Sequence, residues 1–171
     1  MGVQPPEDTY DRLVALLNRS RARYRFIDHQ PEGATVAASR LRGHPPEQAA
    51  KSIVVRVTVA KKVSAYALAV VPGDRKVDLD CVRGLLGGSR VGFAQAETAE
   101  RLAGSVTGTV IPFSFDPKLA LVVDPGLLAH EEIFFNAARL DRSIGLHTHD
   151  YLALSRPRVA AIAQGEPKES A

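Results

Sequence analysis

The 171-residue sequence contains one cysteine, one methionine and no tryptophan. A single cysteine, Cys81, cannot form an internal disulfide, and a zinc ribbon needs several thiolates. One free thiol is typical of a reducing compartment, so we expect a cytoplasmic protein. No apolar run approaches the roughly 18 residues of a membrane-spanning helix, and the first residues lack the charged-then-apolar layout of a secretory signal. We therefore expect no membrane partner.

Neither sign of charge dominates the sequence. The 22 Lys and Arg residues oppose 19 Asp and Glu residues, which leaves a net charge of +3. Hydrophobic residues make up 45% and charged residues 24%, which is ordinary for a globular protein and excludes a disordered or fibrous chain. This mildly basic balance is compatible with a nucleic-acid partner but does not require one.

The sequence also lacks the common catalytic signatures. It has no Gly-x-Ser-x-Gly elbow, no Walker loop and no Gly-x-Gly-x-x-Gly motif. His147, His149 and Asp150 would share one face if they lay on a strand, where they could bind zinc or iron. The favoured alternative is a strand-to-helix turn in which Thr148 or Asp150 caps the following helix. We therefore expect neither a metal nor another cofactor.

Hydrophobic periodicity, glycines and prolines divide the chain into short elements. We expect helices over 5–21, 35–42, 80–86, 96–103 and 150–154, with a further one starting at 45–47. We expect strands over 24–29, 52–59, 65–71, 119–123, 132–137 and 143–147. The sequence therefore predicts one α+β domain over 1–171, with a mixed β-sheet surrounded by short helices, a core of about 10–160 and a frayed tail at 164–171.

Two segments could carry chemistry. Lys51 stands immediately before an apolar strand, where its side chain either extends to solvent or holds a phosphate or an ester at the mouth of a cleft. The segment 104–114 combines two glycines, small hydroxyl residues and a proline, which predicts a tight loop with accessible backbone N–H groups. Such a loop is either a structural turn or a site for an anion or a developing oxyanion.

Basic residues gather in the first quarter of the chain. They could follow a phosphate backbone, although a solvated helix end that favours cations explains many of them equally well. The residues are Arg19, Arg21, Arg23, Arg25, Arg40 and Arg42.

Three separated motifs, at 49–55, 108–113 and 135–143, resemble the YbaK/ProX superfamily in order and spacing. The segments 112–119 and 132–137 look most like its YeaK or ProXp-x branch. The superfamily comprises free-standing relatives of the editing domain of prolyl-tRNA synthetases. The resemblance covers about 10–154 and implies a mixed-sheet α+β fold. It also implies an aminoacyl-tRNA deacylase, which hydrolyses the ester joining a wrong amino acid to the 3′-terminal adenosine of tRNA.

The resemblance assigns roles to individual positions. Lys51 matches the family lysine, and Gly108 and Pro112 match the ends of its Gly-x-x-x-Pro loop. On this basis Lys51 would hold the terminal nucleotide, and backbone N–H groups of the loop would stabilise charge while water attacks the ester with help from a ribose hydroxyl. Ile27, Ile111 and Phe113 would wall the pocket. The remaining expected substrate-binding residues are His29, Ser52, Thr109, Val110, Ser114, Asn136 and Asp141.

The expected substrate is tRNA for proline that carries a small wrong residue such as alanine or 2-aminobutyrate. Removal of serine, threonine or cysteine remains open, since an apolar pocket rejects an added hydroxyl only about a hundredfold. A different class of function also stays open, namely a module that binds tRNA or a synthetase without hydrolysis. Aminoacyl-tRNA is the expected partner, and prolyl-tRNA synthetase is a second one. We expect no binding to DNA.

Overall fold

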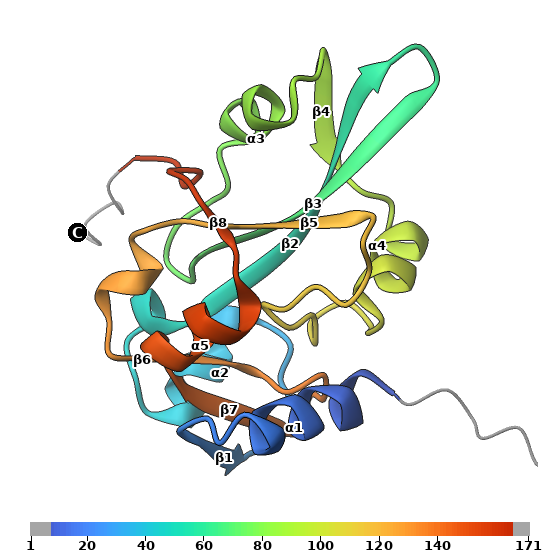
Figure 1. The fold of residues 1–171 in the computed structure, drawn as a ribbon. Helices are drawn as coiled ribbons and strands as arrows, with labels where there is room; N and C mark the ends of the chain where they lie inside the picture. Colours follow the sequence, from blue (N-terminus) through green and yellow to red (C-terminus); the bar gives the residue numbers. More distant parts are fainter. Residues whose placement is uncertain (1–7, 166–171) are drawn as a thin grey trace, which may run out of the picture.

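Two β-sheets organise the protein in the computed structural model, which describes residues 8–165 (Figure 1). A three-stranded antiparallel sheet has the order β1-β7-β6, and a five-stranded mixed sheet has the order β4-β2-β3-β5-β8. The strands are β1 (Tyr24–Asp28), β2 (Ala50–Ala60), β3 (Val63–Pro72), β4 (Arg90–Phe93), β5 (Leu119–Val123), β6 (Glu132–Asn136), β7 (Arg142–His147) and β8 (Arg158–Val159). The helices are α1 (Thr9–Arg19), α2 (Thr35–Arg42), α3 (Leu79–Leu86), α4 (Ala96–Ala103) and α5 (Thr148–Ser155), with 3-10 turns η1 (Pro46–Gln48) and η2 (Leu127–Ala129).

The α+β fold class is confirmed, but the strands form two sheets rather than the single mixed sheet that we expected. The chain leaves β5 through η2, and β6 then pairs with β7 instead of joining β5. One bridge between Ala49 and Phe134 connects the two sheets. The expected amino-terminal start at 5–7 and the frayed tail beyond 165 lie outside the described residues.

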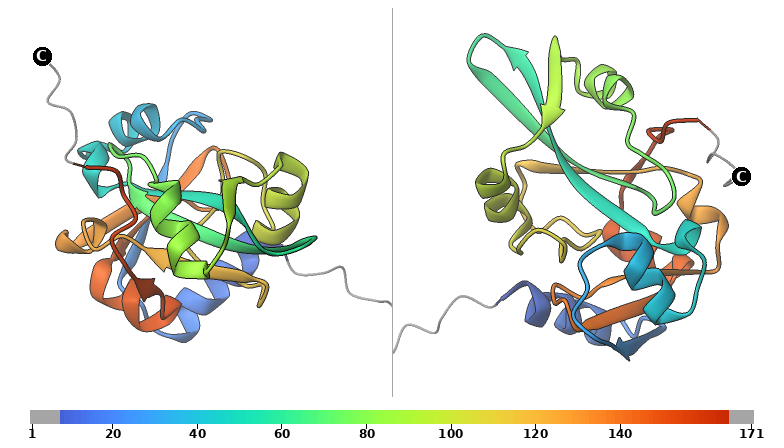
Figure 2. Two further views of the ribbon diagram at one scale, coloured as in Figure 1. Left: turned by 90° about the horizontal axis from the view of Figure 1, so that it is seen from above. Right: turned by 180° about the vertical axis from the view of Figure 1, so that it is seen from behind.

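The long β2–β3 hairpin is the centre of the five-stranded sheet. Both strands have a neighbour on each side, which agrees with their nearly continuous apolar sequences. Alternate side chains face opposite sides, so Val54 packs toward the three-stranded sheet while Val55 and Val57 pack toward α3. The far end of the hairpin, α3 and β4 lie away from the three-stranded sheet and α1 (Figure 2).

Helix α1 lies against the three-stranded sheet. The Asp8 side chain accepts a hydrogen bond from the Asp11 backbone N–H at 2.8 Å, which satisfies one of the free amides at the helix start. Leu13 and Leu17, four residues apart, are fully buried in the core between the two sheets. The apolar face that predicted this helix from the sequence is therefore the face that the structure buries.

Helix α2 leads into the region between the two sheets. It ends at Gly43, whose φ of 81° is a left-handed conformation that favours glycine and stops the helix. Thr35 is the first helical residue, and Ala34 occupies the cap position. This termination places Arg42 in the last turn, facing the interior.

Two strands of the five-stranded sheet, β4 and β8, were not predicted. They are short, and each is defined by its pairing with a longer neighbour, β2 and β5 respectively. Within the part of the chain that the structure describes, no helix is long and apolar enough to cross a membrane.

Candidate active site

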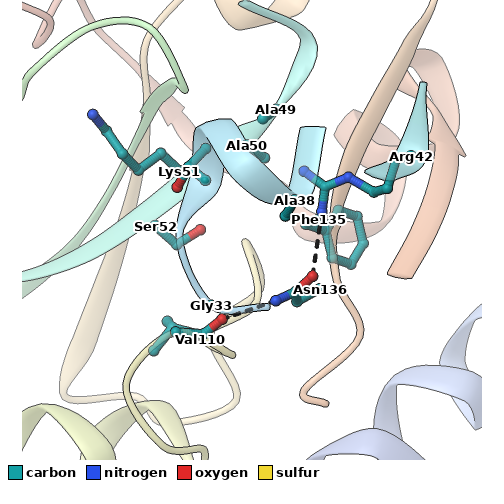
Figure 3. A pocket seen from close by; sticks show the side chains of 12 residues that line it. Gly33, Ala38, Arg42, Ala49, Ala50, Lys51, Ser52, Val110, Phe135 and Asn136 are labelled. Carbon is teal, nitrogen blue, oxygen red and sulfur yellow. Dashed lines mark hydrogen bonds between the residues drawn. The ribbon is translucent and has the colours of Figure 1, made fainter. Parts of the chain in front are cut away.

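A cavity of about 180 Å³ lies where β2 begins, beside α2, β6 and the loop that precedes β5 (Figure 3). It is open on one side, and both sheets contribute to it at the point where Ala49 and Phe134 bridge them. The cavity is lined by Gly33, Thr35, Ala38, Arg42, Ala49, Ala50, Lys51, Ser52, Gly108, Val110, Phe135 and Asn136. Three of the five apolar side chains in its wall are those of alanine, and the small volume suits a short side chain.

Asn136 connects two loops across the cavity. Its Nδ2 donates to the backbone carbonyl oxygens of Glu32 at 2.8 Å and Gly108 at 3.0 Å. Its Oδ1 accepts from the Ser143 hydroxyl at 2.9 Å and from Arg42 Nη1 at 3.3 Å. All four hydrogen-bonding positions of the amide are used, so Asn136 fixes the loop around Gly108 relative to β6.

Arg42 brings a positive charge to the cavity (Figure 3). Its guanidinium donates from Nη1 to the Ser143 hydroxyl at 3.1 Å and from Nε to His44 Nε2 at 2.9 Å, and within residues 8–165 it forms no salt bridge with a carboxylate. Burial lowers the pKa of Arg42 to about 10, which still leaves it charged at neutral pH. A buried cation without a counter-ion can pair with a hydrogen-bond acceptor of a bound ligand.

Lys51 and Ser52 are consecutive in β2 and point to opposite sides. The Ser52 hydroxyl points toward the part of the cavity that holds Asn136, whereas the Lys51 amine extends away from it (Figure 3). Ser52 Oγ is buried and has no hydrogen-bond partner within residues 8–165. Burial lowers the pKa of the half-buried Lys51, the carboxylate of Asp74 opposes this change, and the charge of Lys76 adds to it.

Gly108 makes the closest approach of the loop to the opposite wall. Its φ of 89° lies in the left-handed region, and a Cβ at this position would be 3.1 Å from the Cα of Gly33. A side chain at position 108 would therefore be strained and would push two backbone segments apart. This explains why the loop carries glycine here.

Five of the predicted site residues line the cavity, namely Lys51, Ser52, Gly108, Val110 and Asn136. The expected apolar walls lie elsewhere. Ile111 and Phe113 are 1% and 3% exposed and belong to the core, where Phe113 packs edge-to-face on Tyr151. Ile27 is on β1, paired with Ser143 in the three-stranded sheet. For Ile111 and Phe113 the prediction was wrong because these large apolar side chains are buried in the core rather than placed around a polar opening, and Ile27 does not line the cavity either.

Three further predicted residues form hydrogen bonds that hold the loop before β5 in place. Thr109 Oγ1 donates to the carbonyl of Val106 at 2.7 Å. The Pro112 carbonyl accepts from the buried Tyr151 hydroxyl at 2.7 Å, and the Ser114 hydroxyl donates to the carbonyl of Leu119 at 2.6 Å. None of them lines the cavity, so they shape the loop without reaching a ligand there.

The last two predicted residues stand behind the cavity. His29 Nε2 lies 2.7 Å from the Ser143 hydroxyl, which in turn donates to Asn136. The Asp141 carboxylate pairs with Arg139 at 3.0 Å, and its backbone carbonyl accepts the N–H of His29 at 3.0 Å. Both residues therefore support the network around Asn136 rather than line the cavity.

Four residues that line the cavity were not expected there from the sequence, namely Gly33, Thr35, Ala38 and Arg42. Arg42 was noted only as one of several basic residues, and no local pattern distinguishes it from Arg40. The signal that could have found it is its place in the last turn of an expected helix that ends just before the Lys51 motif. Its contact with Asn136 joins residues 94 positions apart, which spacing along the chain does not reveal.

The alternative metal site is not formed. His147 ends β7 and Thr148 starts α5, so His147 and His149 do not alternate along one strand. Asp150 instead pairs with Arg23 at 3.0 Å. Within residues 8–165 no group of three or more His, Cys, Asp or Glu side chains is placed to hold a metal ion.

Comparison with known proteins gives this cavity a context. The model of the aminoacyl-tRNA editing domain family matches residues 29–154, which include every residue that lines the cavity. The chain belongs to this family. The multifunctional Ser/Thr-tRNA deacylase ProXp-y of Escherichia coli K12 is 39% identical to this editing domain over 152 residues, covering 88% of this chain and 90% of the relative. The protein of the same name from Escherichia coli O157:H7 has the same identity and coverage.

Solved structures confirm the fold of this editing domain. A hypothetical protein superposes with a TM-score of 0.79 at 20% identity, covering 90% of this chain and 99% of the other. A proposed trans-editing enzyme for prolyl tRNA synthetase gives a TM-score of 0.75 at 22% identity, covering 95% of this chain and 100% of the other.

Proposed function

We propose that this editing domain is a deacylase that hydrolyses the ester of tRNA carrying serine or threonine. The observation that carries the proposal is the unpartnered hydroxyl of Ser52, buried in a small cavity beside the Arg42 guanidinium. A short side chain that ends in a hydroxyl fits this space and supplies the missing hydrogen bond. The 39% identical relative, named a Ser/Thr-tRNA deacylase, supports the same choice.

The chemistry of the walls favours a hydroxyl over a methyl group. The volume of about 180 Å³ limits the length of the side chain, and an apolar ligand would leave the Ser52 hydroxyl without a hydrogen-bond partner. A site built to hydrogen-bond a hydroxyl can reject the analogue that lacks it by about 10⁴-fold when its polar groups are fully buried. The cavity is open on one side, so we expect a smaller but clear preference for serine and threonine over alanine.

The hydrolysis needs no nucleophilic side chain, because an aminoacyl ester is already activated. A water oxygen bonds to the ester carbon, the bond to the ribose oxygen breaks, and the proton of the water passes to that ribose oxygen. Backbone N–H groups of the loop 108–112 stabilise the negative charge that develops on the carbonyl oxygen. Lys51 holds the terminal nucleotide at the rim through a charge-assisted hydrogen bond.

Two finer expectations from the sequence stay predictions. One is removal of alanine or 2-aminobutyrate from tRNA for proline, which the small alanine walls would also accept. The other is a partnership with prolyl-tRNA synthetase. The same assay that tests the serine and threonine proposal distinguishes the first of these.

The test is a panel of Ser, Thr, Ala, 2-aminobutyrate, Cys and Pro, each esterified to the same tRNA. We expect Ser and Thr esters to be hydrolysed fastest, and we expect Ser52→Ala to slow them more than it slows the alanine ester. Ser64→Ala, on β3 outside the cavity, is the matched control. Equal slowing of all esters by Ser52→Ala would refute the hydroxyl-reading role.

The panel also separates the other classes of function. Hydrolysis that is unchanged by a chelator excludes a metal-dependent hydrolase. Absence of hydrolysis for every ester, with tRNA binding retained, would instead identify a binding module and overturn the proposal.

A further inference from the structure

We propose that a groove beside the cavity binds the unpaired nucleotides that precede the terminal adenosine of the substrate tRNA. This inference rests on the proposed function and adds a second subsite to it. The groove has a volume of about 780 Å³ and lies on the α3 side of the five-stranded sheet. It is lined by Lys51, Ile53, Lys76, Val77, Asp78, Leu79, Asp80, Val91, Phe93 and Gln164.

The groove is continuous with the candidate active site through one residue. Lys51 lines both the cavity and the groove, and its amine extends away from the cavity (Figure 3). If the amino acid occupies the cavity and Lys51 holds the terminal nucleotide, the nucleotides before it must leave past Lys51. The groove is the space that lies in that direction.

Phe93 gives the groove a surface suited to nucleobases. It is the most exposed large hydrophobic side chain among the described residues, at 63%. Ile53 and Val91 continue the apolar surface beside it. Exposed aromatic rings next to a positively charged groove are the usual means of binding single-stranded nucleic acid, because every base can stack on a ring.

Two lysines of the groove can bind a phosphate. Lys51 and Lys76 both line the groove and bring two ammonium groups to it. Burial lowers the pKa of Lys51, and against it the Asp74 carboxylate raises this pKa by more than the charge of Lys76 lowers it. Both ammonium groups can donate charge-assisted hydrogen bonds to a phosphate in the groove.

The two carboxylates of the groove wall are engaged with α3. The Asp78 side chain accepts from the backbone N–H of Cys81 at 3.3 Å and caps the helix. Asp80 pairs with Arg83 at 3.2 Å. Neither carboxylate forms a salt bridge with Lys51 or Lys76 within residues 8–165, so the two lysines remain available to a ligand.

The cavity and the groove would bind different parts of the substrate, so a full and a truncated substrate together test the groove. Seryl-tRNA fills both the cavity and the groove, whereas seryl-adenosine, the aminoacyl ester of the nucleoside alone, fills only the cavity. We expect Phe93→Ala to lower kcat/KM for seryl-tRNA by about 5-fold or more, as expected for the loss of one base stack, and to leave seryl-adenosine unchanged. Lys76→Ala should lower kcat/KM for seryl-tRNA and reduce the slope of log kcat/KM against log salt concentration by about one.

Matched exposed residues provide the controls. Val63→Ala removes an apolar side chain that is 50% exposed at the end of the hairpin, and Lys118→Ala removes an exposed lysine outside the groove. Neither substitution should change kcat/KM for either substrate. Equal effects of Phe93→Ala on both substrates, or none on seryl-tRNA, would overturn the inference.

A binding measurement keeps this test independent of catalysis. Titration of fluorescently labelled, uncharged tRNA should show weaker binding for Phe93→Ala than for Val63→Ala. If wild-type protein hydrolyses no ester, the proposed function fails, but weaker tRNA binding by Phe93→Ala would still support the groove. Unchanged tRNA binding in that case would refute the groove as well.

Discussion

Replacing Asn136 with alanine should remove the central connection of the site. The change deletes two donated hydrogen bonds, to the carbonyls of Glu32 and Gly108, and the acceptor used by Ser143 and Arg42. Asn136 is only 8% exposed, so the groups left behind are largely shielded from bulk water. The loop around Gly108 then loses the side chain that holds it against β6.

The size of the effect follows from the number of groups that lose a partner. A buried polar group without a partner costs about 1–3 kcal/mol, and water entering the cavity can satisfy some of the four groups. We therefore expect the free energy of unfolding to fall by about 2–4 kcal/mol. For a chain of this length, each 1 kcal/mol lowers Tm by about 2–4 °C, so the expected decrease is about 4–16 °C.

A second substitution at the same position separates stability from positioning. In Asn136→Asp the carboxylate still accepts from Ser143 and gains an ion pair with Arg42, but it cannot donate to the carbonyl of Gly108. We expect Asn136→Asp to recover part of the lost Tm while kcat for seryl-tRNA remains low in both variants. Asn18→Ala, which removes an exposed side chain at the end of α1, is the control and should change neither quantity. A kcat near the wild-type value for Asn136→Asp would refute the positioning role.

Three further predictions concern the rim, the loop and acid stability. Lys51→Ala should abolish most deacylation with an unchanged circular dichroism spectrum, and near wild-type rates would refute its contact with the terminal nucleotide. Gly108→Val should slow hydrolysis strongly, because the new side chain collides with Gly33 in a left-handed backbone conformation, whereas Ser114→Ala should have a smaller effect; the reverse order in rate measurements would indicate a side-chain mechanism. Burial lowers the pKa of His44 to about 4, below the roughly 6.5 of an unfolded chain, so stability should fall as the pH drops from about 6.5 toward 4. Thermal unfolding of His44→Gln over this range should show a weaker pH dependence than wild type, and an equal dependence would contradict the assignment.

Elements with strong local signals were predicted well from the sequence. The helix at 96–103 and the strand at 119–123 have the bounds that the structure gives to α4 and β5. In contrast, β4 has four residues and includes Gly92, so no apolar alternation marks it. The division into two sheets was also missed, because strand pairing depends on contacts between distant segments rather than on local pattern.

Gly108 and Lys51 line the cavity, and both were expected because they belong to motifs that are recognisable in the sequence. Their roles in hydrolysis stay predictions. Arg42 was missed because its role depends on burial beside Asn136, which only the folded chain creates. The apolar walls were misplaced for a similar reason, since nothing local distinguishes Phe113 in the core from a Phe facing a ligand.

The pairing of β1 has a consequence for the order in which the chain can fold. Among the described residues, β1 pairs only with β7, and Asp28 of β1 contacts Arg142 of β7, which lies 114 positions later. A ribosome synthesises the chain from its amino terminus, so β1 emerges early and waits for its partner until most of the protein has been made. Asn136, which lines the cavity, and Ser143, which donates a hydrogen bond to Asn136, emerge in the same late stretch. A nascent chain therefore has no assembled site for an aminoacyl ester until synthesis is nearly finished.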